Sequence, residues 1–214
     1  MAKEFSNQYI FLYISGLVVM IALLLTMVTL GLRPRLEANR ATEKAQQILS
    51  AAGYDLATIP DAVAKLNDVA EPFSDVDGQE MCHIRCADGT AGVVVSVQGK
   101  GLWGPIWGYV VLDAACETIK GVVFSHKSET PGLGAKITEE KFTSSFVGKK
   151  IMNEKREYVS VRVMKPNQGE VAPANRVDAI SGATLTSKGV DEMLYQGLAT
   201  IRQPQNKQAS TPKN

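Results

Sequence analysis

The residues best suited to chemistry lie in one ten-residue segment, 178–187, which reads DAISGATLTS. It carries four hydroxyl side chains beside two minimal residues, Gly182 and Ala183. These small residues leave room for a bulky group to approach the backbone. An apolar helical pattern follows from Val190, and the start of a helix offers unpaired N–H groups and a positive dipole end to a phosphate. The segment is therefore suited to hold a phosphate-bearing group.

A plainer interpretation of the same segment is the ordinary chemistry of a helix start. Thr186 or Ser187 is expected to cap the helix, which leaves Thr184 free. Asp191 and Glu192 would complement the helix dipole in the first turn. Many unrelated proteins share this pattern, so composition alone leaves both interpretations open.

Two glycine-rich stretches suit a flat, ring-shaped ligand. Residues 99–104 read GKGLWG, with Trp107 close behind, and residues 129–134 read ETPGLG. Glycine lets the backbone approach a ring closely, while neighbouring side chains supply apolar packing and hydrogen bonds to its polar edge. The side chains that would do so are Lys100, Leu102, Trp103, Glu129, Thr130 and Leu133. The alternative is a pair of ordinary turns whose tryptophans fill the core.

Residues 178–184 match every fixed position of the flavinylation motif D-x-x-[ST]-G-A-T, and both glycine-rich stretches look like signatures of the same family. On these motifs the chain resembles the FMN-binding domains of the C-type subunit of the sodium-pumping NADH:quinone oxidoreductase, a family shared with the Rnf-complex G subunit. The resemblance implies that a flavin transferase takes FMN from FAD and esterifies it to Thr184, with Asp178 serving recognition or transfer. The other cofactor-binding positions that it implies are Ser181, Gly182, Ala183, Thr186, Lys100, Gly101, Leu102, Trp103, Glu129, Thr130, Gly132 and Leu133.

The resemblance also implies an electron relay. Electrons from NADH would reach the covalent FMN through other subunits, continue to a second FMN in the B-type subunit and pass to quinone, coupled to sodium export. The expected partners are B-, D-, E- and F-type subunits, the flavin transferase and the membrane. The chain has no G-x-G-x-x-G after a predicted strand and no carboxylate cluster in its apolar span. We therefore expect one subunit of a translocating NADH:quinone reductase, with no complete active site and no catalytic residue.

Three other functions compete with this one. The Rnf-complex G subunit works with ferredoxin and NAD, although the G-K-G-L-W form favours the C-type subunit. A membrane-anchored binding or assembly module without redox activity would use residues 181–187 only as a helix cap. A hydrolase with Ser181 or Thr184 as nucleophile is disfavoured, because neither His83 nor His126 belongs to a nucleophile-elbow arrangement.

The elements that must position these residues begin with an apolar run at residues 10–32, which contains no charged side chain. It is longer than the roughly 20 residues needed to cross a membrane and than the h-region of a signal peptide, so we expect an uncleaved transmembrane helix. Arg33, Arg35 and Arg40 would place the following domain in the cytoplasm by the positive-inside rule. The resemblance outweighs this small bias, and we expect a single-pass bacterial inner-membrane protein with a periplasmic flavin domain.

Beyond the span, the pattern predicts an α+β fold, a mainly antiparallel sheet with flanking helices. Apolar and β-branched runs predict neighbouring strands at residues 81–87, 92–98, 106–113 and 118–125. Asp88 and Gly89 predict the turn between the first two strands. A further strand is predicted at residues 158–164 and a loop at residues 72–78.

Helical spacing and stop signals predict the helices. One starts at Pro34 and ends at Gly53, a short one lies at residues 62–66, another is capped by Thr138, and the last runs from Val190. The predicted organisation is an N-terminal tail 1–9, a transmembrane helix 10–32, a helical linker region 33–80, an FMN-binding domain 81–201 and a disordered tail 202–214.

Charge and cysteine content narrow the function classes. The formal net charge of +1 gives no electrostatic reason to expect a nucleic-acid partner. The three thiols, Cys82, Cys86 and Cys116, lack the four ligands of a structural zinc site. We expect no metal, and interpret the cysteines as small buried hydrophobes, with a Cys82–Cys86 disulfide if the compartment is oxidising.

Overall fold

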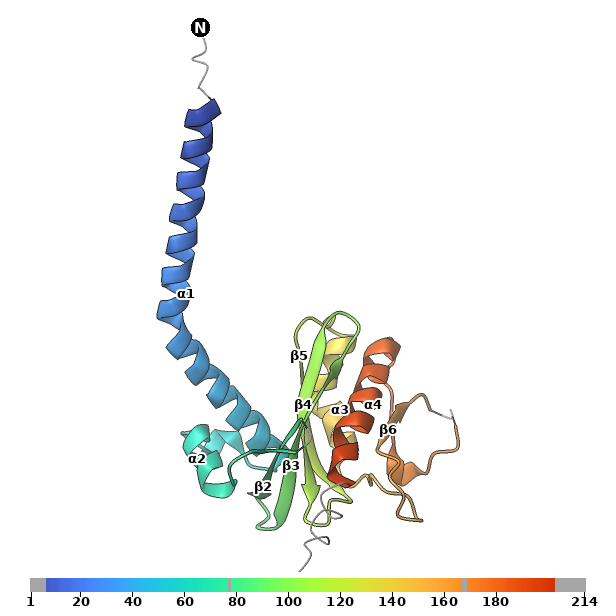
Figure 1. Cartoon of the computed structure of the whole chain (residues 1–214). Coiled ribbons are helices and arrows are strands. Elements are labelled where there is room, and N and C mark those ends of the chain that lie inside the picture. The colour runs from blue at the N-terminus through green and yellow to red at the C-terminus, as the bar shows by residue number, and fades with distance from the viewer. Residues whose placement is uncertain (1–6, 77, 167–168, 203–214) are drawn as a thin grey trace, which may run out of the picture. The chain divides into compact units, whose positions relative to one another are not determined.

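The computed structural model describes residues 7–76, 78–166 and 169–202. The chain divides into two units, Met1–Glu43 and Lys44–Asn214. Helix α1 (Asn7–Ala51) begins in the first unit and ends in the second (Figure 1). The predicted tail from residue 203 onward, the first six residues and Asp77 lie outside the described residues.

As far as the structure describes it, the first unit is the exposed part of α1 up to Glu43, which contains the apolar run 10–32. Within the described residues, α1 is the one helix long and apolar enough to cross a membrane, with a mean hydropathy of 2.6 in its most apolar stretch. The prediction that a helix starts at Pro34 is wrong, because Pro34 lies inside α1. Proline removes one backbone donor, but its fixed φ is helical, and a helix of 45 residues continues through that loss.

The second unit is built on a five-stranded antiparallel sheet in the order β1-β2-β3-β4-β5. Its strands are β1 (Ser74–Val76), β2 (Gln79–Arg85), β3 (Ala91–Lys100), β4 (Pro105–Asp113) and β5 (Ile119–His126). The four predicted strands and the Asp88-Gly89 turn are confirmed, with Gly89 at a φ of 79°. The edge strand β1 lies where a loop was predicted.

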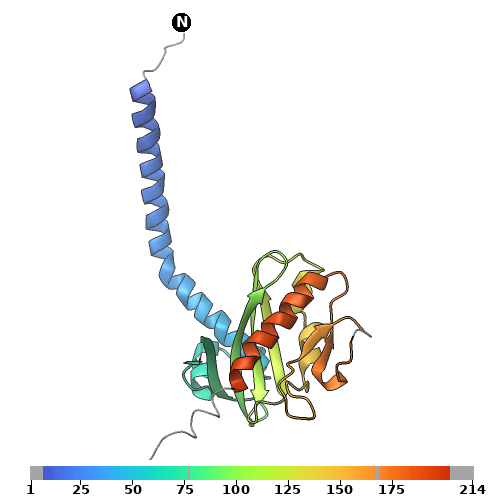
Figure 2. The same ribbon diagram turned by 45° about the vertical axis from the view of Figure 1, so that its right-hand side comes forward.

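Helices cover both faces of this sheet (Figures 1 and 2). On one face, α4 (Thr184–Ala199) packs against β3 through Val190, Leu194 and Leu198 in the larger core cluster. On the other face, the end of α1 and α2 (Ala62–Val69) share a second cluster with alternate residues of β2 and β4 and with Val94 of β3. This layering confirms the predicted α+β class and explains why β3 is buried on both faces.

The remaining elements are short and lie beside the sheet. They are η1 (Leu56–Thr58), η2 (Gly134–Thr138), α3 (Glu140–Thr143), η3 (Ser144–Phe146), β6 (Arg162–Met164), η4 (Pro173–Asn175), β7 (Arg176–Asp178) and η5 (Thr200–Arg202). β6 and β7 form a separate parallel pair. This pair leads the chain into the segment that precedes α4.

Three local predictions need correction. The strand predicted at residues 158–164 is shorter in the structure, where only β6 forms a strand. Ser160 has a φ of 60°, which interrupts the extended backbone before β6. Thr138 does not cap α3; its hydroxyl donates to the carbonyl of Ala135, and the helix begins after Glu139 without a side-chain cap. The helix predicted from Val190 already begins at Thr184.

The expected Cys82–Cys86 disulfide does not form. Both thiols are free and buried: Cys82 lies in β2, Cys86 directly follows the strand, and both belong to the same core cluster. Four residues of extended strand separate their Cα atoms by about 13 Å, roughly twice the span of a disulfide. Burial raises the pKa of Cys82 to about 12, which keeps the thiol protonated and inert.

Candidate functional site

The three predicted motif segments meet at one buried carboxylate, that of Glu129. The side chain is buried, with a residue exposure of 4%. Its Oε1 accepts a hydrogen bond from the backbone N–H of Trp103 at 2.9 Å, and its Oε2 accepts one from the Thr186 hydroxyl at 2.7 Å. The loop after β3, the loop after β5 and the first turn of α4 are therefore joined through a single side chain.

Hydrogen bonds decide the charge of this carboxylate. Burial alone would raise the pKa of Glu129, but the Thr186 hydroxyl and the backbone amides of Trp103, Gly104 and Leu102 outweigh it. The pKa therefore lies below its ordinary value, and Glu129 is ionised at neutral pH. Its negative charge is balanced by the chain's own donors.

Glycines let the loops approach Glu129 closely. A Cβ added at Gly101 would overlap Glu129 Oε1, and one added at Gly134 would overlap Oε2. On α4, Gly189 lies against the backbone carbonyl of Lys100 in the same way. Gly101 was predicted as a site residue, whereas Gly134 and Gly189 were not. Gly134 closes the ETPGLG stretch, whereas Gly189 directly precedes the helix predicted from Val190, and no pattern indicated its close approach.

Thr184 stands at the exposed start of α4. The residue before it, Ala183, is the N-cap and makes no side-chain hydrogen bond to the first turn. Gly182, with a φ of 80°, allows the sharp turn that precedes the helix. Thr184 therefore begins a helix whose first-turn N–H groups are satisfied by no capping side chain, at the end where the helix dipole favours an anion.

The predicted cap is wrong because both candidate hydroxyls have other partners. The Thr186 hydroxyl is buried and donates to Glu129. Ser187 is also buried, and its Oγ accepts a hydrogen bond from the backbone N–H of Ile180 at 3.1 Å. Both contacts fix the motif segment from inside and leave its outer side accessible.

Exposed apolar side chains occur on all three motif segments. They are Leu102, Trp103, Leu133 and Leu185, with Trp103 66% and Leu185 59% exposed. A Cβ added at Gly182 would lie 3.0 Å from Leu133 Cδ2, so two of the segments touch. Exposed apolar groups that gather in one place mark binding surfaces. Leu185 was not predicted from the sequence, although it directly follows Thr184.

The other predicted site residues lie at the ends of strands and in turns. Lys100 is exposed at the end of β3, and Asp178 is exposed at the end of β7. Thr130 is exposed, and Gly132 takes a φ of 74° in the turn that follows it. Asp178 and Ser181 are exposed, and neither side chain has a hydrogen bond or ion pair within the described residues.

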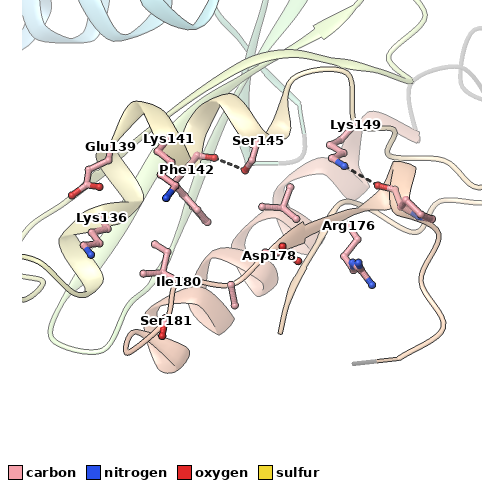
Figure 3. A pocket seen from close by; sticks show the side chains of 13 residues that line it. Lys136, Glu139, Lys141, Phe142, Ser145, Lys149, Arg176, Asp178, Ile180 and Ser181 are labelled. Carbon is pink, nitrogen blue, oxygen red and sulfur yellow. Dashed lines mark hydrogen bonds between the residues drawn. The ribbon is translucent and has the colours of Figure 1, made fainter. Parts of the chain in front are cut away.

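A cavity of about 620 Å³ lies beside the motif segment (Figure 3). One wall is formed by residues 176–181, from β7 into the motif, and the opposite wall by η2 and α3. Basic side chains line it, with Phe142 and Ile180 among its apolar residues. No single sequence pattern indicated this cavity, because its walls come from segments about 40 residues apart.

Comparison with known proteins decides the family. Residues 101–199 match the FMN-binding domain family. The Haemophilus ducreyi protein named as the C subunit of Na(+)-translocating NADH-quinone reductase is 40% identical over 105 residues, which cover 48% of this chain. The crystal structure of the protein of the same name from Parabacteroides distasonis is 36% identical, with a TM-score of 0.71, and the match covers 80% of this chain and 95% of that one. The chain belongs to this C-type subunit family.

Further members agree with the assignment. The protein of the same name from Vibrio campbellii is 30% identical over 154 residues, covering 69% of this chain and 58% of its own length. The chain spans about two fifths of the first curated relatives that it matches, 38% and 39% of their lengths. The crystal structure of Shewanella oneidensis NqrC is 24% identical with a TM-score of 0.65, and it shows the same fold.

Proposed function

We propose that this chain is a membrane-anchored electron-transfer subunit of a sodium-pumping NADH:quinone oxidoreductase, with FMN held as a phosphoester on Thr184. The observation that carries the proposal is the exposed residue Thr184 at the uncapped start of α4. Residues 178–184 around it have the D-x-x-S-G-A-T sequence of a flavinylation site. Membership of the C-type subunit family and the match to FMN-binding domains support the same function.

The residues present fit such a group. Thr184 Oγ would hold the phosphate, and the first-turn N–H groups of α4 would stabilise its negative charge. Leu102, Trp103 and Leu133 expose apolar surface that would pack against the ring, and Lys100 would bond its polar edge. Glu129 already accepts hydrogen bonds on both oxygens, so it would hold the loops in place around the ring.

The attachment reaction transfers FMN from FAD to the Thr184 hydroxyl. Thr184 Oγ forms a bond to the flavin-side phosphorus of FAD, the bond between the two phosphates breaks and AMP leaves. A base of the flavin transferase takes the hydroxyl proton. When bound, FMN supplies redox chemistry. The ester keeps the flavin from being lost while the domain exchanges electrons with its partners, and it maintains a high local concentration.

The rest of the proposed role concerns the complex. The apolar residues 10–32 anchor the chain in a bacterial inner membrane, with the flavin domain at residues 81–201 on the periplasmic side. Residues 1–9, 33–80 and 202–214 serve as tail, helical linker region and C-terminal tail. The chain exchanges electrons with B-, D-, E- and F-type subunits. NADH oxidation and sodium passage therefore take place in other subunits.

The test is to co-express the full chain with a flavin transferase, extract it in detergent, and measure intact mass and in-gel flavin fluorescence. We expect wild type to gain one FMN, less water. Thr184→Ala should gain none, because it removes the oxygen that forms the ester. Thr138→Ala, which removes another exposed threonine hydroxyl, should be modified like wild type.

The rival function gives a different result. A non-redox binding or assembly module would leave wild type colourless and unmodified even with an active transferase. A mass increase that persists in Thr184→Ala would show that the flavin is attached to another residue. An Rnf-type G subunit would also carry FMN on Thr184, and copurifying subunits separate it from the function proposed here.

A further inference from the structure

The cavity beside the motif segment carries an excess of positive charge. Four basic and two acidic residues line it: Lys136, Lys141, Lys149, Arg176, Glu139 and Asp178. Lys149 donates to the carbonyl of Pro173 at 2.8 Å. The side chains of Lys136, Lys141 and Arg176 have no hydrogen bond or ion pair within residues 7–76, 78–166 and 169–202. Three cations on the cavity wall are thus available to an external partner.

The interior of the cavity is apolar. Phe142 and Val177 are buried in the larger core cluster, and Ala179 and Ile180 are half-buried against it. A volume of about 620 Å³ is well within the range of protein pockets that bind ligands. A ligand that fits this arrangement has an apolar group at its centre and negative charges around it.

The cavity shares a wall with the flavinylation motif. Residues 178–181 line the cavity, and the same segment continues to Thr184 three residues later. The wall is fixed, because Ile180 N–H donates to Ser187 Oγ and Ala183 N–H donates to the Ile180 carbonyl. A protein bound in the cavity would therefore hold a fixed position relative to the Thr184 hydroxyl.

The spread of the cations favours several negative charges over one. Lys136 comes from η2, Lys141 from α3 and Arg176 from β7. Figure 3 shows Lys136 and Arg176 at opposite ends of the cavity. A single phosphate needs donors that converge on one point, whereas carboxylates distributed along a peptide can pair with separated cations.

We propose that this cavity is the docking site of the enzyme that loads Thr184, which inserts a segment bearing carboxylates around an apolar side chain. The inference rests on the proposed function, because it assumes that Thr184 is the modified residue. Charge attraction brings the acidic segment to the cavity, and its apolar side chain enters between Phe142 and Ile180. The site then supplies affinity for the transferase without contributing to the bond-making step.

The test measures initial rates of FMN incorporation into the full chain, using purified flavin transferase, FAD and intact-mass readout. The pocket variant combines Lys136→Glu, Lys141→Glu and Arg176→Glu. A matched control reverses one arginine and two lysines that are exposed elsewhere: Arg85→Glu, Lys155→Glu and Lys165→Glu. We expect about tenfold or greater loss of kcat/KM in the pocket variant, through KM, and less than about twofold change in the control.

Salt provides a measurement that needs no variant. Raising potassium chloride from about 50 to about 500 mM should slow wild type severalfold through KM, since screening weakens charge attraction. Equal rates for the pocket variant and wild type, or a wild-type rate indifferent to salt, would overturn the docking site. The proposed function would survive that result. A wild type that never gains FMN would overturn both.

A direct binding measurement distinguishes a nucleotide ligand from the proposed peptide segment. AMP titrated into the full chain should show no saturable binding that depends on the cavity. If wild type binds AMP in the micromolar range and the pocket variant does not, the cavity binds the nucleotide part of FAD. That result would overturn the proposal that a peptide segment docks there.

Discussion

At the scale of single residues, the candidate site depends on how Glu129 is satisfied. The carboxylate lies where two loops and the first turn of α4 meet, and it accepts hydrogen bonds from Trp103 and Thr186. A hydrogen bond to a charged group contributes more than one between neutral groups. The side chain that the sequence suggested as a ligand contact is therefore also a structural link between the loop 99–104 and the first turn of α4.

Replacing Glu129 with glutamine should lower the free energy of unfolding by about 1–3 kcal/mol, because an amide NH₂ cannot accept from the Trp103 N–H or the Thr186 hydroxyl. Chemical denaturation of the two proteins measures the difference. Glu154→Gln is the matched control, since this glutamate is exposed and has no ion pair within the described residues. A loss no larger than that of the control would remove Glu129 from its structural role.

The same variant has a pH signature. The pKa of Glu129 is lowered on folding, so its contribution is complete above the unfolded value of about 4.5 and is lost as pH falls through the lower, folded value. The stability difference between wild type and Glu129→Gln should therefore be constant near pH 7 and shrink below about pH 4.5. A difference that grows on acidification would contradict the assignment.

At the scale of elements, the position of α4 decides where Thr184 lies. α4 packs against β3, and Gly189 brings its backbone onto the Lys100 carbonyl. This contact holds the start of the helix close to the loop 99–104, which carries Leu102 and Trp103. The geometry of the site is thus set by a helix-to-strand approach that only glycine permits.

Gly189→Ala tests that approach. Alanine in an unconstrained helix stabilises by about 1 kcal/mol relative to glycine, so propensity alone predicts a gain. Here the added methyl would overlap backbone, and we expect a net loss of about 1–3 kcal/mol in the free energy of unfolding, with slower FMN incorporation. Gln196→Ala, at an exposed position of α4, should stay within about 0.5 kcal/mol of wild type. A stabilised Gly189→Ala would refute the close packing.

At the scale of the whole molecule, the proposal places the anchor in the membrane and the flavin domain outside the cytoplasm. The charged residues that follow the span argue for the opposite side, so the two arguments can be separated by experiment. The native cysteines suit a labelling test, since Cys82 and Cys86 are buried and Cys116 is half-buried.

Lys155→Cys in a Cys116→Ser background introduces one exposed thiol in the flavin domain. With the outer membrane permeabilised and the inner membrane intact, an inner-membrane-impermeant maleimide should label it as fully as after lysis. The Cys116→Ser parent supplies the background from the buried thiols. Labelling that appears only after lysis would place the domain in the cytoplasm and favour the charge argument.

The sequence by itself determined the features that depend on local patterns. The apolar run 10–32 and the four strands β2 to β5 follow from hydrophobic periodicity. The Gly89 turn and the stop near Gly53 follow from the left-handed backbone that glycine adopts easily. Residues 178–184 identified the family before any fold was known.

Only the tertiary structure decided which groups these residues contact. Thr186 looks like a helix cap in its own segment, but its hydroxyl bonds to Glu129, 57 residues away. The close approach of Gly189 to Lys100 and the basic cavity likewise join segments that are distant along the chain. A hydroxyl has several acceptors of similar strength, so the packing of the whole chain, not local preference, selects the partner.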